Sequence, residues 1–195
     1  MRVGLLRALA NRNYRIYASG NAVSMTGTWV QRVAVGWLAW ELTESTTWLG
    51  LIAFAELLPT LLVGLFAGAV ADKGRRLRLF RISQVLALSQ ATMLWLLTLF
   101  NLINAELILI LTLYLGFVYG FAQPVRLALI PSLVRPNDLH AAISCNSLLF
   151  NVARVIGPIV AGIIIINWNI AHAFAINMVT YCILLWLSRS LRIHN

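Results

Sequence analysis

The sequence predicts an all-α membrane protein of six transmembrane helices, and three observations lead to this fold class. Hydrophobic residues make up 61% of the 195 positions and charged residues only 11%, whereas soluble domains average about half and about a quarter. Six apolar runs are each long enough to cross the roughly 30 Å hydrocarbon core of a bilayer. The basic residues lie almost entirely between alternate pairs of these runs, which is how lysine and arginine mark the cytoplasmic side of a membrane.

The six spans follow one another with short polar breaks and form a single bundle over residues 1–195. The first span is the most polar and contains Arg32, the second contains Glu56, and the fifth contains Arg154. Pro124 is expected to end the fourth span, because proline removes a helix hydrogen bond. The predicted spans are residues 14–40, 48–71, 80–100, 107–123, 141–166 and 170–187.

A large soluble helical bundle is the alternative interpretation of so apolar a chain. The helices of such a bundle need a charged face, but residues 82–105 contain no charged side chain. The membrane interpretation is therefore favoured.

Charge also predicts the orientation of the spans. Every basic residue except Arg32 and Arg154 lies in the N-terminal segment, the second loop, the fourth loop or the C-terminal tail, and the other three loops carry Glu41, Glu44 and Glu106 instead. Since basic segments are retained in the cytoplasm, both termini are expected there. The net charge of +9, which in a soluble chain would indicate a nucleic-acid partner, is explained by this orientation, so no nucleic acid is expected.

Other residue types receive structural interpretations. Cys145 and Cys182 lie in apolar stretches, where a free cysteine behaves as a small hydrophobe, so no disulfide or catalytic thiol is expected. The sequence contains no P-loop, no paired carboxylates at catalytic spacing and no cluster of metal ligands, which predicts no enzymatic activity, no cofactor and no metal. An aromatic belt at the outer membrane interface is expected from Trp29, Trp37, Trp40 and Trp48.

The junction of the second and third spans carries a glycine, an aspartate four residues later, and then a basic cluster. A glycine permits close helix packing, and arginines can pair with the aspartate or cap neighbouring helix ends. We interpret the segment as a gating loop. In the family signature that it resembles, a second glycine follows the aspartate by three residues, whereas Gly74 follows it by two. Its candidate residues are Gly68, Asp72, Lys73, Arg75 and Arg76. This segment resembles the loop signature of the major facilitator superfamily.

Further stretches resemble one branch of that superfamily, which contains the bacterial enterobactin exporter and related multidrug and secretion transporters. They are residues 11–15, 27–38, 123–131 and 146–158, and the resemblance covers essentially the whole chain. It implies the N-terminal six-helix half of a two-bundle fold, with the substrate path between the bundles.

The resemblance also implies a function. It implies proton-coupled efflux of a small molecule such as a siderophore or a drug across the bacterial inner membrane, by a bundle embedded in lipid that works with a second six-helix bundle. That second bundle would be a missing C-terminal half or another copy. Two alternatives stay open, an inactive truncated fragment and a membrane subunit that transports nothing without a partner bundle.

Charged side chains in a bilayer are costly unless they are paired or face a cavity, so Arg32 and Glu56 are candidate pathway residues. Arg32 precedes Trp40 by eight residues and Glu56 follows Trp48 by eight, which places the two at similar depth on antiparallel spans. An ion pair is predicted. It could lock the helices together, or Glu56 could couple transport to protons by taking up a proton when Arg32 moves away. A cavity is also predicted beside the first span, from the shared face of Ser24, Thr28, Gln31 and Arg32.

The fifth span presents a second polar arc, formed by Ser147, Asn151, Arg154 and Pro158. Arg154, near the midplane, could bind an anionic group of a substrate or pack against backbone carbonyls. Gly157 and Pro158 predict a helix bend, which could serve rocking or be static. Further candidates for lining a path, or for mere packing, are Gln90, Tyr114, Tyr119 and Gln123. Close helix packing is predicted at two pairs of glycines, Gly64 with Gly68 and Gly116 with Gly120.

Overall fold

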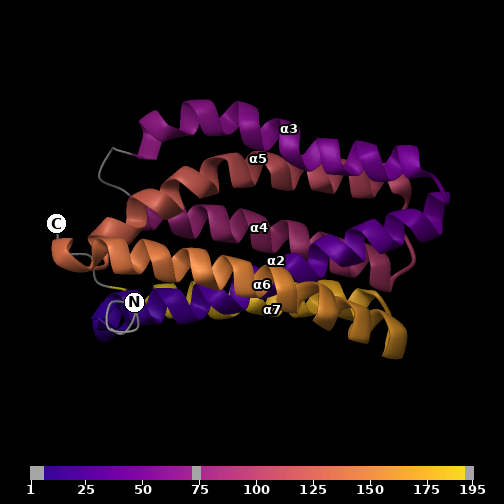
Figure 1. Cartoon of the computed structure of the whole chain (residues 1–195). Helices are drawn as coiled ribbons and strands as arrows, with labels where there is room; N and C mark the ends of the chain where they lie inside the picture. Colours follow the sequence, from indigo (N-terminus) through magenta and orange to yellow (C-terminus); the bar gives the residue numbers. More distant parts are fainter. Residues whose placement is uncertain (1–6, 72–75, 192–195) are drawn as a thin grey trace.

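Six long helices make up the computed structural model, which describes residues 7–71 and 76–191. Two single-turn 3₁₀ helices, Ile130–Ser132 and Pro136–Asp138, connect the fourth and fifth of them. The described ranges contain no strand, so the all-helical prediction is confirmed. The helices, shown in Figure 1, are α2 (Arg12–Thr43), α3 (Thr46–Ala71), α4 (Arg76–Leu99), α5 (Ala105–Leu129), α6 (Leu139–Asn167) and α7 (Ala171–Ser188).

Five of these helices, α3 to α7, are long and apolar enough to cross a membrane. The chain is therefore a multi-pass integral membrane protein. The helix α2 is long as well, with 32 residues, but it buries polar side chains such as Asn21, Ser24 and Gln31 inside the protein. The helix α2 is less apolar than the other helices because these polar side chains face the protein interior.

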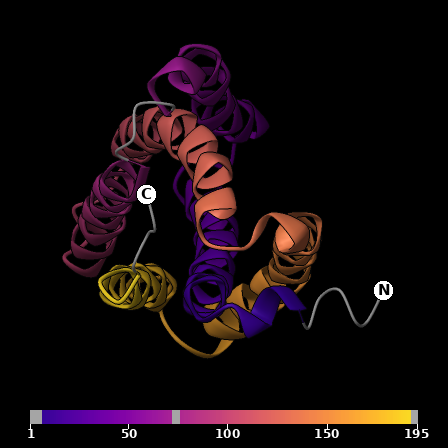
Figure 2. The same cartoon turned by 90° about the vertical axis from the view of Figure 1, so that its left-hand side faces the viewer.

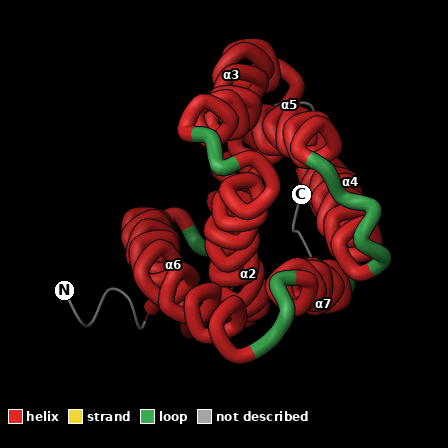
Figure 3. The backbone as a smooth tube through the Cα atoms, turned by 90° about the vertical axis from the view of Figure 1, so that its right-hand side faces the viewer, coloured by secondary structure: helices red, strands yellow, loops and turns green. Residues whose placement is uncertain are grey.

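The helices pack in a definite order around the interior. The helix α2 packs against α6 and α7, α4 lies between α5 and α7, and α3 packs on α5. Figures 2 and 3 show this arrangement along the bundle from its two ends, with α3 and α6 on the outside. As a result, α2, α4, α5 and α7 surround the centre of the bundle.

Apolar side chains form the core near both ends of this interior. One cluster includes Tyr17, Phe80 and Leu129, and another includes Leu94 and Phe174. Between them lie buried polar residues such as Gln31, Gln90 and Asn177. On the outer face of α3, by contrast, apolar side chains are exposed, with Leu65 at 80%, as suits a helix in contact with lipid.

The helices begin and end within four residues of the predicted spans, except at the end of the fourth. The helix α5 continues through Pro124 to Leu129, so the predicted end at Gln123 was wrong. Proline removes one hydrogen bond but does not end a membrane helix whose surroundings support the backbone. Further along, the end of α5 is capped, since Arg76 Nη1 donates to the carbonyl of Ala128 at 3.1 Å. This contact also places Arg76 as a cap of a neighbouring helix end.

Glycines bring α3 and α5 close together, as the spacing of Gly116 and Gly120 predicted. A Cβ atom at Gly116 would lie 2.7 Å from the carbonyl oxygen of Glu56, and one at Gly120 would lie 2.6 Å from Cβ of Val63. The hydroxyl of Thr60 donates to the carbonyl of Gly116 at 3.0 Å across the same contact. The remaining members of the predicted gating loop, Asp72, Lys73 and Arg75, lie outside the described residues, as do the surroundings of Gly68.

Candidate functional site

A polar pocket of about 300 Å³ lies between α2, α5 and α6. Most of the polar side chains that line it carry hydrogen-bond donor groups, and none of the described residues that line it is acidic. The lining consists of Met25, Thr28, Trp29, Arg32, Tyr119, Ala122, Gln123, Arg126, Asn146, Ser147, Phe150 and Asn151. Four of the predicted pathway residues, Thr28, Arg32, Ser147 and Asn151, therefore border one cavity.

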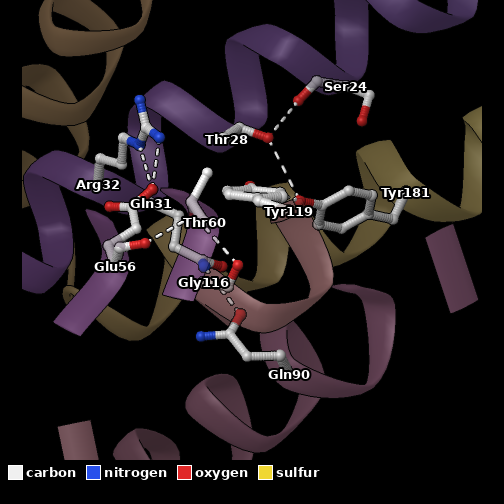
Figure 4. A network of polar contacts seen from close by, with 10 residues as sticks. All are labelled: Ser24, Thr28, Gln31, Arg32, Glu56, Thr60, Gln90, Gly116, Tyr119 and Tyr181. Carbon is white, nitrogen blue, oxygen red and sulfur yellow. Dashed lines mark hydrogen bonds and ion pairs between the residues drawn. The ribbon is translucent and has the colours of Figure 1, made fainter. Parts of the chain in front are cut away.

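The predicted ion pair between Arg32 and Glu56 is present at the edge of this pocket (Figure 4). Arg32 Nε donates to Glu56 Oε1 at 2.9 Å, and Arg32 Nη2 donates to the same oxygen. The side chains are 35% and 18% exposed, respectively. Because the pair is partly buried, losing one partner would leave a poorly solvated charge.

Hydroxyl groups extend the polar contacts from this pair into the bundle. The hydroxyls of Tyr119 and Tyr181 lie 3.1 Å apart, and that of Tyr181 lies 3.3 Å from the hydroxyl of Thr28. Figure 4 shows this chain linking α5, α7 and α2. Thr60 completes the surroundings of Glu56 by donating to its backbone carbonyl at 2.7 Å.

Trp29 lies at the centre of the site and contacts two arginines. The guanidinium carbon of Arg32 lies 4.7 Å from the centroid of the indole ring, and that of Arg154 lies 5.7 Å from it. Phe150 packs edge-on against the same ring at 6.0 Å. The prediction that Trp29 belongs to the outer aromatic belt was wrong, since its ring fills the space between α2 and α6. Trp37 and Trp40 are exposed, which is compatible with a belt.

The polar arc of α6 borders the pocket along one side. Ser147 and Asn151 line it, and the amide of Asn151 donates to the carbonyl of Ser147 at 2.8 Å. Arg154 lies one turn further on and reaches the pocket through its contact with Trp29. The helix continues past Gly157 and Pro158 to Asn167. Gly157 lies directly against the backbone of α2, where a Cβ atom would collide with Trp29.

Gln31 lies apart from these residues, in a buried amide network. Its side chain donates to Gln90 Oε1 at 2.9 Å and accepts from Asn177 Nδ2 at 2.8 Å. Gln31 and Gln90 border a second pocket of about 280 Å³, which also includes Glu56. Thr28, Arg32 and Tyr119 line both pockets, so these three side chains separate the two cavities.

Arg126 was not among the predicted site residues, because the sequence pattern placed this arginine in a loop. With α5 extended through Pro124, the residues Tyr119, Gln123 and Arg126 fall at helical spacing on one face and line the pocket together. Arg126 Nη2 donates to Gln84 Oε1 at 3.2 Å. The spacing itself would have revealed this face if the helix had not been ended at the proline.

Two comparisons place the chain among known proteins. Residues 4–194 match the sequence family described as transmembrane secretion effector. The staphyloferrin A transporter of Staphylococcus aureus (strain NCTC 8325 / PS 47) is 28% identical over 170 residues, which are 87% of this chain and 43% of that protein. The chain therefore spans less than half the length of this relative.

Proposed function

Since the chain belongs to the transmembrane secretion effector family of the major facilitator superfamily, we propose that it forms a six-helix bundle of a secondary transporter for a small molecule. The family membership predicted from the sequence is confirmed by this match. The relative is named as a transporter, and we extend that activity to this chain as a proposal. A siderophore or a drug is the proposed class of cargo, moved outward in exchange for protons.

The observation that carries the proposal is a polar pocket with a partly buried ion pair in a bundle whose outer surface exposes many apolar side chains. Ionisable groups at membrane depth are costly, and they are retained where a substrate or ion must pass. Packing alone would be served better by apolar side chains of similar volume. The pocket also borders α6, whose Asn151 and Arg154 are exposed beside it.

The proposed arrangement in the membrane follows the distribution of charge. All six helices, including the polar α2, would cross the bilayer, with both termini in the cytoplasm and the bundle in the bacterial inner membrane. A second six-helix bundle would cover the pocket. The two bundles would rock about it, with the basic segment at residues 72–81 latching the cytoplasmic side in one state.

Proton coupling would act through Glu56. While the pair is formed, the carboxylate of Glu56 accepts two hydrogen bonds from the guanidinium of Arg32. When Arg32 moves away, the carboxylate would lose its counter-ion, and a proton from solution would take the place of Arg32, since no other basic side chain lines the adjoining pocket among the described residues. Return of Arg32 would expel that proton, which links the state of the ion pair to proton movement.

The test is flux through purified protein reconstituted into liposomes with a pH gradient and a pH-sensitive dye inside. A panel of staphyloferrin A, other siderophores and lipophilic cations supplies the solutes. We expect solute-dependent proton flux that is lost in Arg154→Gln and retained in Arg15→Gln, an exposed arginine of α2 outside the pocket. Crosslinking reports whether a second copy is present. Absence of flux with every solute would reject transport by this chain and favour a non-transporting membrane subunit.

A further inference from the structure

We infer that the pocket between α2, α5 and α6 binds an anion with two or more carboxylate groups, and that this anion competes with Glu56 for Arg32. The inference rests on the proposed function, since it names the class of solute that the same pocket would carry.

The charges around the pocket are not balanced. Arg32 and Arg126 line it, and Arg154 lies over the Trp29 ring that forms part of its wall. Glu56 neutralises Arg32, and within the described ranges no other acidic side chain forms an ion pair with these three arginines. Arg126 is partly buried, Arg32 is 35% exposed and Arg154 is exposed beside the pocket. Uncompensated positive charge at membrane depth is unfavourable, so an anion is the expected occupant.

Arg32 and Arg154 both lie over the Trp29 ring. Of these two arginines, one keeps a guanidinium edge available for such an anion. A stacked guanidinium uses its face for the ring and keeps its planar N–H edge for hydrogen bonds. That edge of Arg32 is occupied by Glu56, whereas Arg154 has no acidic partner in the part of the chain that the structure describes. Arginine binds a carboxylate with two parallel hydrogen bonds, so the free edge of Arg154 fits one carboxylate of the ligand.

Arg126 supplies a place for a second carboxylate. Its Nη2 donates to Gln84, but its buried Nε has no hydrogen-bond partner among the described residues. A buried donor without an acceptor is unfavourable, and a ligand oxygen would satisfy it. The amides of Gln123 and Asn146 add neutral donors on the same pocket wall.

The competition follows from the position of Arg32 between the two pockets. Glu56 approaches it from the adjoining cavity, and a ligand carboxylate would approach it from the larger one. No other cation lines that adjoining cavity among the described residues; its remaining polar side chains are Thr28, Gln31, Gln90, Thr112 and Tyr119. Because the same guanidinium edge would serve both carboxylates, removing that of Glu56 should strengthen binding of the ligand.

Equilibrium dialysis of the purified full chain in detergent micelles at neutral pH tests the inference with tricarballylate, a compact tricarboxylate. Its neutral trimethyl ester and the cation tetraphenylphosphonium are the matched comparison probes. We expect saturable binding of tricarballylate alone. Arg154→Gln and Arg126→Gln should each weaken it about tenfold, which corresponds to 1.4 kcal/mol. Glu56→Gln should strengthen it about fivefold, and Arg15→Gln should leave it unchanged.

Three results would overturn the inference. They are equal binding of the ester, preference for tetraphenylphosphonium, and weaker binding in Glu56→Gln. If circular dichroism shows that Arg154→Gln does not fold, Arg154→Lys replaces it in the test. Unchanged affinity of Arg154→Lys for tricarballylate would also overturn the inference. Binding without flux in liposomes would reject transport but leave the anion site standing. Flux of a cation without binding of tricarballylate would reject the anion site but leave transport standing.

Discussion

Replacing Gly157 by alanine should separate α2 from α6 at the centre of the site. A Cβ atom there would collide with Cβ of Trp29 and lie 3.2 Å from its backbone carbon and 3.3 Å from the carbonyl oxygen of Thr26. Backbone atoms cannot rotate aside, so the helices must move apart. Overpacking of this kind costs about 1 to 3 kcal/mol, while the exchange of glycine for alanine in a helix gains about 1 kcal/mol. The net loss in free energy of unfolding is therefore smaller than the steric cost.

Gly162→Ala on the same helix is the matched control, since nothing lies within 4 Å of its added Cβ atom. Because both substitutions share the gain in helix propensity, the difference between the two variants isolates the steric cost, about 1 to 3 kcal/mol. Reversible unfolding by sodium dodecyl sulfate in mixed micelles, followed by circular dichroism, measures it. Equal stability of the two variants would contradict the close approach of α6 to Trp29.

Three further predictions concern contacts between helices. Gly116→Ala should be less stable than Gly50→Ala by about 1 to 3 kcal/mol, because its Cβ atom would meet backbone carbonyls of α3 whereas that at Gly50 meets nothing within 4 Å; equal unfolding midpoints would refute this. In a double-mutant cycle of Arg32→Gln and Glu56→Gln, the free energies of unfolding should show a coupling of about 1 to 3 kcal/mol, and additive effects would count against the ion pair. Gln31→Leu leaves two buried amide partners without their hydrogen bonds to Gln31. It should lower the free energy of unfolding by about 1 to 3 kcal/mol for each of these groups. If Gln31 served only for packing, leucine would replace it at little cost in stability.

The ion pair illustrates what could be predicted from the sequence alone. Arg32 and Glu56 stand at equal distances from the tryptophans that flank a short turn, and antiparallel helices of equal rise must bring such positions to one depth. The glycine spacing of α5 marked a close-packing face on this helix by a similar local rule, but it did not show that α3 would cover that face. Both predictions depend on neighbours in the chain, for which helical geometry is sufficient.

Trp29 and Arg126 could not be placed in the same way. The contact of Trp29 with Arg154 joins helices more than 120 residues apart in sequence, and no periodicity within α2 shows which helix will cover it. Arg126 was misplaced for another reason, because Pro124 disfavours a helix locally but the packing of α5 against its neighbours overrides that preference. Residues of the pocket that come from α5 and α6 thus depend on tertiary contacts.

The ion pair of Arg32 and Glu56 joins two helices that make few other contacts with each other. On one side, glycines and Thr60 join α3 to α5 at backbone distance. On the other side, α2 is joined as closely to α7 at Gly27 and to α6 at Gly157. Contacts between α2 and α3 are sparse, and the described salt bridge spans that gap. Side chains can exchange partners, whereas close-packed backbones cannot shift without steric cost. A change at Arg32 would therefore loosen the contact between α2 and α3, while α4, which packs against both α5 and α7, holds the bundle together. A solute that takes Arg32 from Glu56 would therefore release the described ion pair between α2 and α3.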